Sequence, residues 1–396
     1  MASDGRVLAL NCGSSSVKLA LVDPVSGDRS VEGLAERVGT GDVVLRLGRG
    51  GGHIAVDAPA DVTHLGVVAA MVAALTDEER AWVTAVGHRV VHGGSRFTGS
   101  VRVDDDVLIG LHDVEPLAPL HIPGNVAGMI AARAALPGVP NVAVFDTAFH
   151  RTLPPHAYHY AVPQAWFAEH GVRRYGFHGI SHRYVTSRAA MMLGRPLEQL
   201  HLVSVHLGNG CSACAVRAGE SVDTTMGLTP LEGLVMGTRS GDVDAGVLGY
   251  VGRRLGLDLD GVVAELTNSS GLLGLSGLSN DMRTLVDAAA AGSSDAALAV
   301  DVFCYRTAKA VCAMATALDR VDAVVLTGGI GEHATSVRSG IMAHLAVLGV
   351  AEDAVANAAH GAATSGRISA AGSTTVLVVP TDEELVIARE TTAVVG

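Results

Sequence analysis

Aromatic side chains are scarce in this chain, and so are cysteines. Only 4% of its 396 residues are Phe, Trp or Tyr, so the hydrophobic cores must be packed by Val, Leu, Ile and Ala. The five cysteines, an odd number in a long chain, fit reduced thiols rather than a disulfide framework. Cys211 and Cys214 form a CxxC, but in a strand their side chains point to opposite faces, and no second pair completes a zinc site.

Positive charge is also in short supply. The chain has 28 Lys and Arg against 40 Asp and Glu, which gives a formal net charge of −12 at pH 7. This balance argues against a nucleic-acid or anionic membrane surface, because phosphate backbones demand concentrated positive charge. A small anionic substrate stays compatible with it if a few arginines are focused in a cleft. We therefore expect small-molecule substrates, and neither nucleic acid nor a membrane as partner.

Long apolar runs are missing. Residues 1–6 lack the apolar core of a signal peptide, and no segment approaches the length of a membrane span. These absences predict a cytoplasmic protein. The 396 residues, of which 48% are hydrophobic, suffice for two cores and hence for two domains.

The segment 7–23 runs from a short apolar strand through a Gly/Ser-rich loop into another apolar strand. Gly13 lets the backbone approach a ligand closely, and the serines at 14–16 supply hydroxyls and amides for phosphate oxygens. Asn11 and Lys18 frame the loop, one as a polar or metal-linked ligand and the other as a positive charge. No Gly precedes Lys18 and no Ser or Thr follows it, which excludes a Walker A loop. The segment predicts a phosphate-binding hairpin; an ordinary hairpin turn is the alternative for this stretch alone.

Two further glycine loops follow in the same style. Residues 201–207 alternate like a strand, turn at 208–210 and return through 211–216. The third loop, 327–333, follows the apolar run 323–326, and a helix is expected after it. Two strand–loop–strand phosphate hairpins and a strand–Gly–Gly turn suited to a nucleoside are the layout of the duplicated actin, Hsp70 and sugar-kinase architecture.

Strands alternate with Ala-rich helical stretches along the chain. Segments such as 85–87 and 295–318 show the two patterns, which together predict α/β layers. The Pro-rich stretch 152–163 is the expected crossing between domains, since its prolines interrupt regular structure. The expected domains are residues 1–150 plus 385–396, and residues 151–384.

Three arginines stand in settings where a charge is costly without a partner. Arg89 lies among apolar neighbours at an expected strand end, Arg239 in a Gly/Ser loop, and Arg283 in a third loop. Each alone fits a structural ion pair, but together in so acidic a chain they favour an anion cleft. Asp146 directly follows the expected strand 142–145, where α/β folds place catalytic groups; a helix or turn cap is the alternative.

Ten motifs in order resemble the acetokinase family, the acetate kinases within the actin-like ATPase superfamily. They cover essentially the whole chain, at residues 11–18, 87–94, 117–121, 145–149, 175–182, 206–212, 224–240, 270–277, 327–332 and 380–385. The resemblance implies a two-domain, duplicated, ribonuclease H-like α/β fold, with ATP and acetate as the substrates. It also implies Mg²⁺-dependent, reversible phosphoryl transfer giving acetyl phosphate and ADP, with Mn²⁺ as a substitute metal, by a homodimer.

The resemblance also implies roles for individual residues. The catalytic set would be Asp146, His178 and Arg239, with His178 bonded to the phosphoryl group in flight. Mg²⁺ would be held by Asn11 and Glu383. The substrate would be bound by Arg89, Val91, Leu120, Phe177 and Pro230. The nucleotide would be held by Lys18, His206, Leu207, Gly208, Asn209, Gly210, Asp281, Met282, Arg283, Gly329, Ile330, Gly331, Glu332 and His333. The i,i+4 spacing of His178 and His182 also suits a zinc pair, but the Glu of HExxH is missing.

Two departures from the family pattern stand out. Ile122-Pro123-Gly124 replaces the usual Asn-Pro-Pro before Asn125, which is expected to loosen a loop near the substrate. His333 replaces the usual Asn, which is expected to alter nucleotide preference. Neither change removes a charged catalytic group.

The chemistry of the reaction indicates which role Asp146 has. Acetate is ionised at neutral pH, so its attack on phosphorus needs no general base but does need relief of anion–anion repulsion. Positioning Mg²⁺ or orienting Arg89 is therefore the more economical role for Asp146. Propionate or butyrate phosphorylation stays open, although Val91 favours a small acid. A chaperone or filament ATPase would need a peptide-binding domain or polymer surfaces for which the chain has no spare length.

Overall fold

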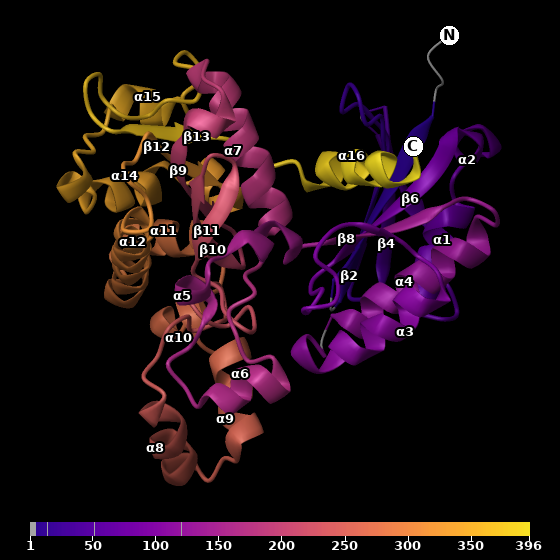
Figure 1. Cartoon of the computed structure of the whole chain (residues 1–396), viewed down its shortest axis with the longest axis horizontal. Helices are drawn as coiled ribbons and strands as arrows, with labels where there is room; N and C mark the ends of the chain where they lie inside the picture. Colours follow the sequence, from indigo (N-terminus) through magenta and orange to yellow (C-terminus); the bar gives the residue numbers. More distant parts are fainter. Residues whose placement is uncertain (1–4, 14, 51, 120) are drawn as a thin grey trace. The chain divides into compact units, whose positions relative to one another are not determined.

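The chain divides into two compact units (Figure 1). The computed structural model describes residues 5–13, 15–50, 52–119 and 121–396. Unit 1 comprises Met1–Ala148 and Asp382–Gly396, and unit 2 comprises Phe149–Thr381. The Pro-rich stretch 152–163 lies wholly within unit 2 and carries the short helix α5, Pro155–Tyr158, so the chain changes unit before this stretch and not along it.

Unit 1 is built on one sheet of eight strands in the order β5-β4-β3-β2-β1-β6-β8-β7. Its strands β1 to β5 pair antiparallel, whereas β6 pairs parallel with both β1 and β8. The strands are β1 (Arg6–Cys12), β2 (Ser16–Val22), β3 (Arg29–Glu36), β4 (Val44–Arg49), β5 (Gly52–Val56), β6 (Val83–Val90), β7 (Val101–Arg102) and β8 (Asn141–Phe145). The helices are α1 (His64–Ala73), α2 (Asp77–Trp82), α3 (Asp105–Val114), α4 (Ile122–Ala135) and α16 (Glu383–Val395).

The sheet of unit 1 is buried on both faces near β1, as the nearly unbroken apolar sequence of that strand requires. One face packs Leu8 and Leu10 into a core with α1 and α4. The other face is covered by α16, which packs on β1 and β6. Gly87 allows this close approach, because a Cβ there would lie 2.3 Å from Thr391 Oγ1 and 2.6 Å from Ile387 Cγ2. The carboxy-terminal helix thereby brings Glu383, in its first turn, to unit 1.

Unit 2 repeats the design with five strands in the order β11-β10-β9-β12-β13. These strands are β9 (His201–Leu207), β10 (Cys211–Arg217), β11 (Glu220–Thr224), β12 (Ala323–Thr327) and β13 (Thr375–Val378). Their order and directions match β3-β2-β1-β6-β8 of unit 1: an antiparallel hairpin, a third antiparallel strand beside it, and two parallel strands on the other side. The predicted duplicated α/β architecture and both predicted hairpins are confirmed.

Helices cover both faces of the second sheet. The helix α7 packs on β9 and β12, and α12 packs on β9 and β10. Figure 1 shows α8 and α9 at the end of unit 2 farthest from its sheet. The remaining helices of the unit are α6 (Gln164–His170), α7 (Gly179–Leu193), α8 (Gly246–Leu255), α9 (Leu259–Asn268), α10 (Gly271–Ser276), α11 (Met282–Ala290), α12 (Ser294–Ala315), α13 (Gly328–His333), α14 (Thr335–Ala343) and α15 (Ala354–Ala358). Among the described residues, no helix has the length and apolar character needed to cross a membrane.

Candidate active site

Arg89 is the centre of a polar cluster in unit 1. The parallel strands β1, β6 and β8 end at one edge of the sheet, and Asn11 pairs with Arg89 in the register of β1 and β6. The guanidinium donates from Nη1 to Asn11 Oδ1 at 3.2 Å and from Nη2 to Asp146 Oδ2. Its Nε lies 3.7 Å from Glu383 Oε2 on α16. Three residues from three separate segments thus meet at one cation.

The charge of Arg89 is fixed by its surroundings. Burial disfavours the cation, but the charges of Asp146 and Glu383 outweigh this and raise the pKa of Arg89 above its ordinary value. The side chain of Asp146 is 1% exposed and that of Arg89 is 16% exposed, so water screens the pair weakly. A guanidinium held in this way stays protonated and fixed in orientation.

Asn11 and Glu383 fit a magnesium ion that is held mainly by other partners. Both supply the hard oxygen donors that Mg²⁺ prefers, and both flank the same guanidinium. No group of three or more His, Cys, Asp and Glu side chains in the described part of the chain could hold a metal. One or two protein oxygens completed by substrate phosphates and water are the usual setting of Mg²⁺.

Asn125 ties this edge together, a role that the sequence did not reveal. Its Nδ2 donates to Cys12 O at 2.8 Å, and its Oδ1 accepts from Val91 N at 3.3 Å, which links the first hairpin loop to the segment after β6. The expectation that residues 122–124 form a loop is wrong, because they are helical. Ile122 is fully buried and begins α4, and Asn125 lies in the first turn of that helix. Val91 is buried beside it, whereas Leu120 and Ser14 lie outside the described residues.

The second hairpin loop is the meeting point of unit 2. A Cβ built on Gly210 would lie 2.6 Å from Arg239 Nη2 and 3.2 Å from His178 Nε2, so two predicted catalytic side chains converge over this glycine. Arg239 also donates from Nη1 to Pro230 O at 2.6 Å. Burial lowers the pKa of Arg239 from its ordinary value. The absence of a side chain at Gly210 is what lets the guanidinium and the imidazole approach the loop together.

His178 is held in a backbone conformation that residues other than glycine rarely adopt. Its φ of 56° and ψ of 24° are left-handed, directly before α7. Its ring stacks on that of His206, with centroids 4.4 Å apart, and His206 Nδ1 lies 2.8 Å from Ser181 Oγ. The preceding Phe177 is buried. Such strain outside glycine is concentrated at functional sites, because the surrounding fold must maintain it.

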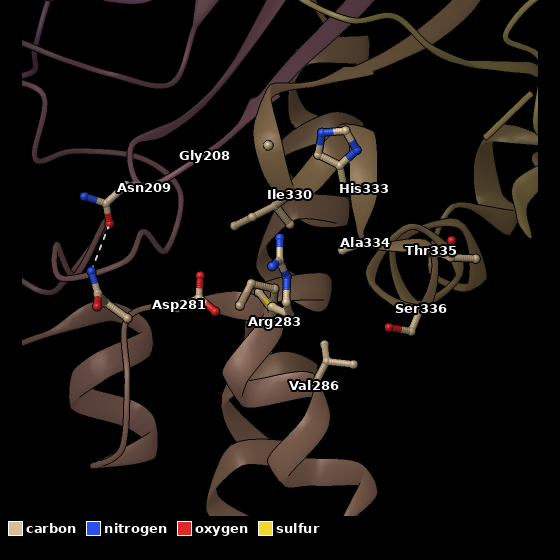
Figure 2. Close-up of a pocket in the computed structure, with 13 residues that line it drawn as sticks. Gly208, Asn209, Asp281, Arg283, Val286, Ile330, His333, Ala334, Thr335 and Ser336 are labelled. Atoms are coloured by element: carbon tan, nitrogen blue, oxygen red, sulfur yellow. Dashed lines mark hydrogen bonds between the residues drawn. The ribbon is translucent and has the colours of Figure 1, made fainter. Parts of the chain in front are cut away.

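A cavity of about 800 Å³ lies in unit 2 between the second hairpin loop and the amino-terminal ends of α11, α13 and α14 (Figure 2). Eight of the predicted nucleotide residues line it: Gly208, Asn209, Asp281, Met282, Arg283, Gly329, Ile330 and His333. Sequence reasoning missed five further lining residues: Asn280, Val286, Ala334, Thr335 and Ser336. The predicted residues that do not line it are Lys18, His206, Leu207, Gly210, Gly331 and Glu332.

The walls of the cavity are fixed by local hydrogen bonds. Asp281 caps α11 by accepting from Thr284 N at 2.8 Å, and this bond lowers the pKa of Asp281. Asn280 Nδ2 donates to Asn209 Oδ1 at 3.4 Å, the dashed line in Figure 2. On the opposite wall, Glu332 Oε1 accepts from Gly328 N at 3.0 Å. Glu332 therefore shapes the third glycine loop from behind and does not face the cavity.

Comparisons with known proteins agree with this arrangement. The sequence profile of the acetokinase family matches residues 6–389. The acetate kinase of Deinococcus radiodurans is 53% identical over 391 residues, and that of Pseudomonas aeruginosa PAO1 is 50% identical over 388 residues, each covering 98% of both chains. The crystal structure of a propionate kinase from Francisella tularensis superposes with a TM-score of 0.93, and that of Porphyromonas gingivalis acetate kinase with 0.91. Both are 40% identical to this chain and cover 99% of it and 100% of their own lengths. The chain therefore belongs to the acetokinase family, and its two-unit α/β fold is the actin-like fold of that family.

Proposed function

We propose that the protein transfers the γ-phosphoryl group of ATP to acetate, reversibly and with Mg²⁺, to give acetyl phosphate and ADP. The observation that carries the proposal is the convergence of Arg239 Nη2 and His178 Nε2 over Gly210. Two nitrogen donors above a glycine turn suit the oxygens of a phosphoryl group in transfer. The nearby cavity, about 800 Å³ and bordered by the adjoining Gly208 and Asn209, has the size expected for a nucleotide.

The chain's own residues have an electrostatic task. Acetate carries its negative charge at neutral pH and needs no proton removed before it attacks. Arg89 would bind the carboxylate, and Asp146 would orient that guanidinium through the hydrogen bond between them. Arg239 and His178 would stabilise the charge on the phosphoryl oxygens. Asp146 has no proton to take in this scheme, so its role is positioning.

Mg²⁺ would be held by Asn11 and Glu383, together with phosphate oxygens of the nucleotide and water. When bound, the ion supplies neutralisation of phosphate charge. Mn²⁺ has the same preference for oxygen ligands and is proposed as a substitute. His333 lines the nucleotide cavity, so its replacement of Asn is proposed to affect nucleotide preference.

Acetate is the proposed substrate, with propionate and butyrate as alternatives. One of the similar solved structures is described as a propionate kinase, which keeps that alternative open. Val91, Phe177 and Pro230 would contact the methyl group, as would Leu120. Each extra methylene without room costs about 1–3 kcal/mol, or roughly 10–200-fold in kcat/KM. Comparison of kcat/KM for the three acids decides between them; a higher value for propionate than for acetate would overturn the choice.

The reaction itself is tested by trapping acetyl phosphate as hydroxamate. ATP, Mg²⁺ and acetate should give a hydroxamate signal that depends on all three components. A non-kinase ATPase would release phosphate from ATP without any acetate-dependent product, and that result would reject the proposal.

We further propose a cytoplasmic homodimer that joins through α8 and α9 of unit 2. These helices pack on each other and expose Tyr250, Leu255 and Leu259 at 61%, 66% and 65%, and apolar side chains gathered on neighbouring helices suit an association surface. Sedimentation equilibrium of the wild type and of Leu259→Glu tests the surface. A dimeric wild type and a monomeric variant are expected, whereas two dimers of equal affinity would place the interface elsewhere.

A further inference from the structure

A continuous hydrogen-bonded chain runs through unit 2 and ends at His178. His178 precedes α7 and His182 lies in its first turn, so the i,i+4 spacing puts both on one face. Ser212 Oγ on β10 lies 2.8 Å from His178 Nδ1 and 2.8 Å from His182 Nε2. Ser204 Oγ on β9 lies 2.8 Å from His182 Nδ1. The two histidines that suited a zinc pair by spacing thus share a serine hydroxyl.

Ser204 determines which group donates in each of these hydrogen bonds. Its side chain is fully buried, and its hydroxyl contacts only His182 Nδ1 among the described polar side-chain atoms. A buried hydroxyl hydrogen that is not donated carries a large desolvation penalty. The Ser204 hydroxyl therefore donates to His182 Nδ1, which has to accept.

The remaining bonds follow from this first one. Burial holds the pKa of His182 well below its ordinary value, so its ring is neutral and carries one hydrogen. Because Nδ1 accepts, that hydrogen is on Nε2 and is donated to Ser212 Oγ. The hydroxyl of Ser212 is then left to donate to His178 Nδ1. His178 consequently carries its hydrogen on Nε2.

We propose that Ser204, His182 and Ser212 are positioning residues that hold His178 in the Nε2–H tautomer. The imidazole then presents a hydrogen-bond donor at the atom that lies beside Arg239 over Gly210, without first acquiring a proton. This inference rests on the proposed role of His178 toward the phosphoryl group. It adds to that role the device that selects which ring nitrogen is the donor.

A neighbouring histidine provides a matched control. His150 is also buried, and its Nδ1 lies 2.8 Å from Ser221 Oγ. Its Nε2, however, lies 3.0 Å from Phe177 O, a carbonyl that can only accept. The carbonyl alone fixes the hydrogen of His150 on Nε2. Removal of the Ser221 hydroxyl should leave that tautomer unchanged, whereas both partners of His182 are hydroxyls and can reverse.

The test uses ¹⁵N-histidine NMR of the full chain, in which the ring nitrogen shifts report the tautomer directly. Comparison with His178→Gln and His182→Gln assigns the two rings. Both rings should carry hydrogen on Nε2 in the wild type. In Ser204→Ala both should become tautomer mixtures, and kcat should fall about tenfold while KM for ATP and acetate changes by less than about twofold. Ser221→Ala should keep the wild-type tautomers and kcat.

Hydrogen on Nδ1 of wild-type His178 or His182 would overturn the inference, and this measurement needs no folded Ser204 variant. Unchanged tautomers in a folded Ser204→Ala would also overturn it. The spectra do not depend on turnover. If both rings carry hydrogen on Nε2 in a protein that makes no acetate-dependent hydroxamate, the proposed hydrogen-bond directions would stand and the proposed reaction would be rejected.

Discussion

Replacement of Asp146 by Asn separates an orienting carboxylate from a general base. Asn keeps the size and an oxygen acceptor for Arg89 Nη2 but removes the negative charge. Two unit charges about 4 Å apart interact by about 4 kcal/mol at an effective dielectric constant near 20. Part of this interaction energy holds the guanidinium of Arg89 in position. Loss of one well-placed charge-stabilising group costs about 2.7–4 kcal/mol of barrier, so kcat should fall about 10²- to 10³-fold.

The assay is hydroxamate formation across pH, together with a double-mutant cycle. If Asp146 acts through Arg89, Asp146→Asn and Arg89→Ala together should be no slower than Arg89→Ala alone, because both changes disable the same guanidinium. The pH profile of kcat should keep its shape in Asp146→Asn, since no proton transfer is removed. Asp113→Asn is the matched control, because Asp113 pairs with Arg96 at 3.1 Å but is 70% exposed. Its kcat should match the wild type.

Two results would refute the orienting role. One is an acid limb of the wild-type pH profile that disappears in Asp146→Asn. The other is a double variant slower than Arg89→Ala by the full factor of the Asp146 change, as independent contributions require. The first would restore proton transfer through this carboxylate, and the second would show that Asp146 does not act through Arg89.

Three further outcomes follow from the contacts. Gly210→Ala should lower kcat about 10²-fold with little change in the unfolding midpoint. The added Cβ would displace the flexible end of Arg239, 2.6 Å away, and not the backbone. A kcat equal to that of the wild type would contradict the convergence of Arg239 and His178 over Gly210. Arg239→Ala should lower kcat about 10³-fold, and Arg239→Lys should recover only part of this loss. A lysine ammonium is a point charge and cannot keep the bond to Pro230 O while it meets a phosphoryl oxygen. Full activity of the Lys variant would show that two separate guanidinium nitrogens are not needed. Burial lowers the pKa of His88 to about 4, so between pH 6.5 and 4 this residue binds more protons in the unfolded chain, and it alone should lower the unfolding free energy by about 3 kcal/mol over that range. Urea unfolding of the wild type and His88→Gln should show this slope reduced in the variant.

The sequence predicted the glycine loops and their flanking strands well, because each has a local sequence pattern. Both hairpin loops and the strand before the third glycine loop follow from alternating apolar residues interrupted by glycine. The whole-chain resemblance then predicted the duplicated α/β fold, which the matching strand orders of the two sheets confirm. The domain boundaries and the assigned roles of site residues remain predictions.

The side chains that join distant segments were not visible in the sequence. Asn125 links Cys12 to Val91 across a sheet edge, and only the three-dimensional approach of α4 to β1 and β6 reveals those bonds. Ser204 and Ser212 are single serines in apolar strands, and nothing in the local sequence distinguishes a serine that faces a histidine from one that faces a methyl group. The lining residues Thr335 and Ser336 start a helix after the third loop, and their facing depends on how that helix packs.

The two repeats place different chemistry at equivalent positions of the same backbone. In unit 1 the penultimate residue of the first hairpin strand is Asn11, which pairs with Lys18 across the hairpin and with Arg89 on the parallel strand. Both neighbours are cations. The polar edge of this unit is therefore built from charges that the strand register itself supplies.

In unit 2 the equivalent residue is His206, and its neighbours in register are Ser212 across the hairpin and Thr327 on the parallel strand. All three side chains are neutral or weakly basic, and the cation nearest to Gly210, Arg239, comes from a loop instead. In the proposed reaction Arg89, anchored in the sheet of unit 1, would bind the carboxylate. Arg239, which donates to Pro230 O, and the imidazole of His178 would meet the phosphoryl group that is transferred.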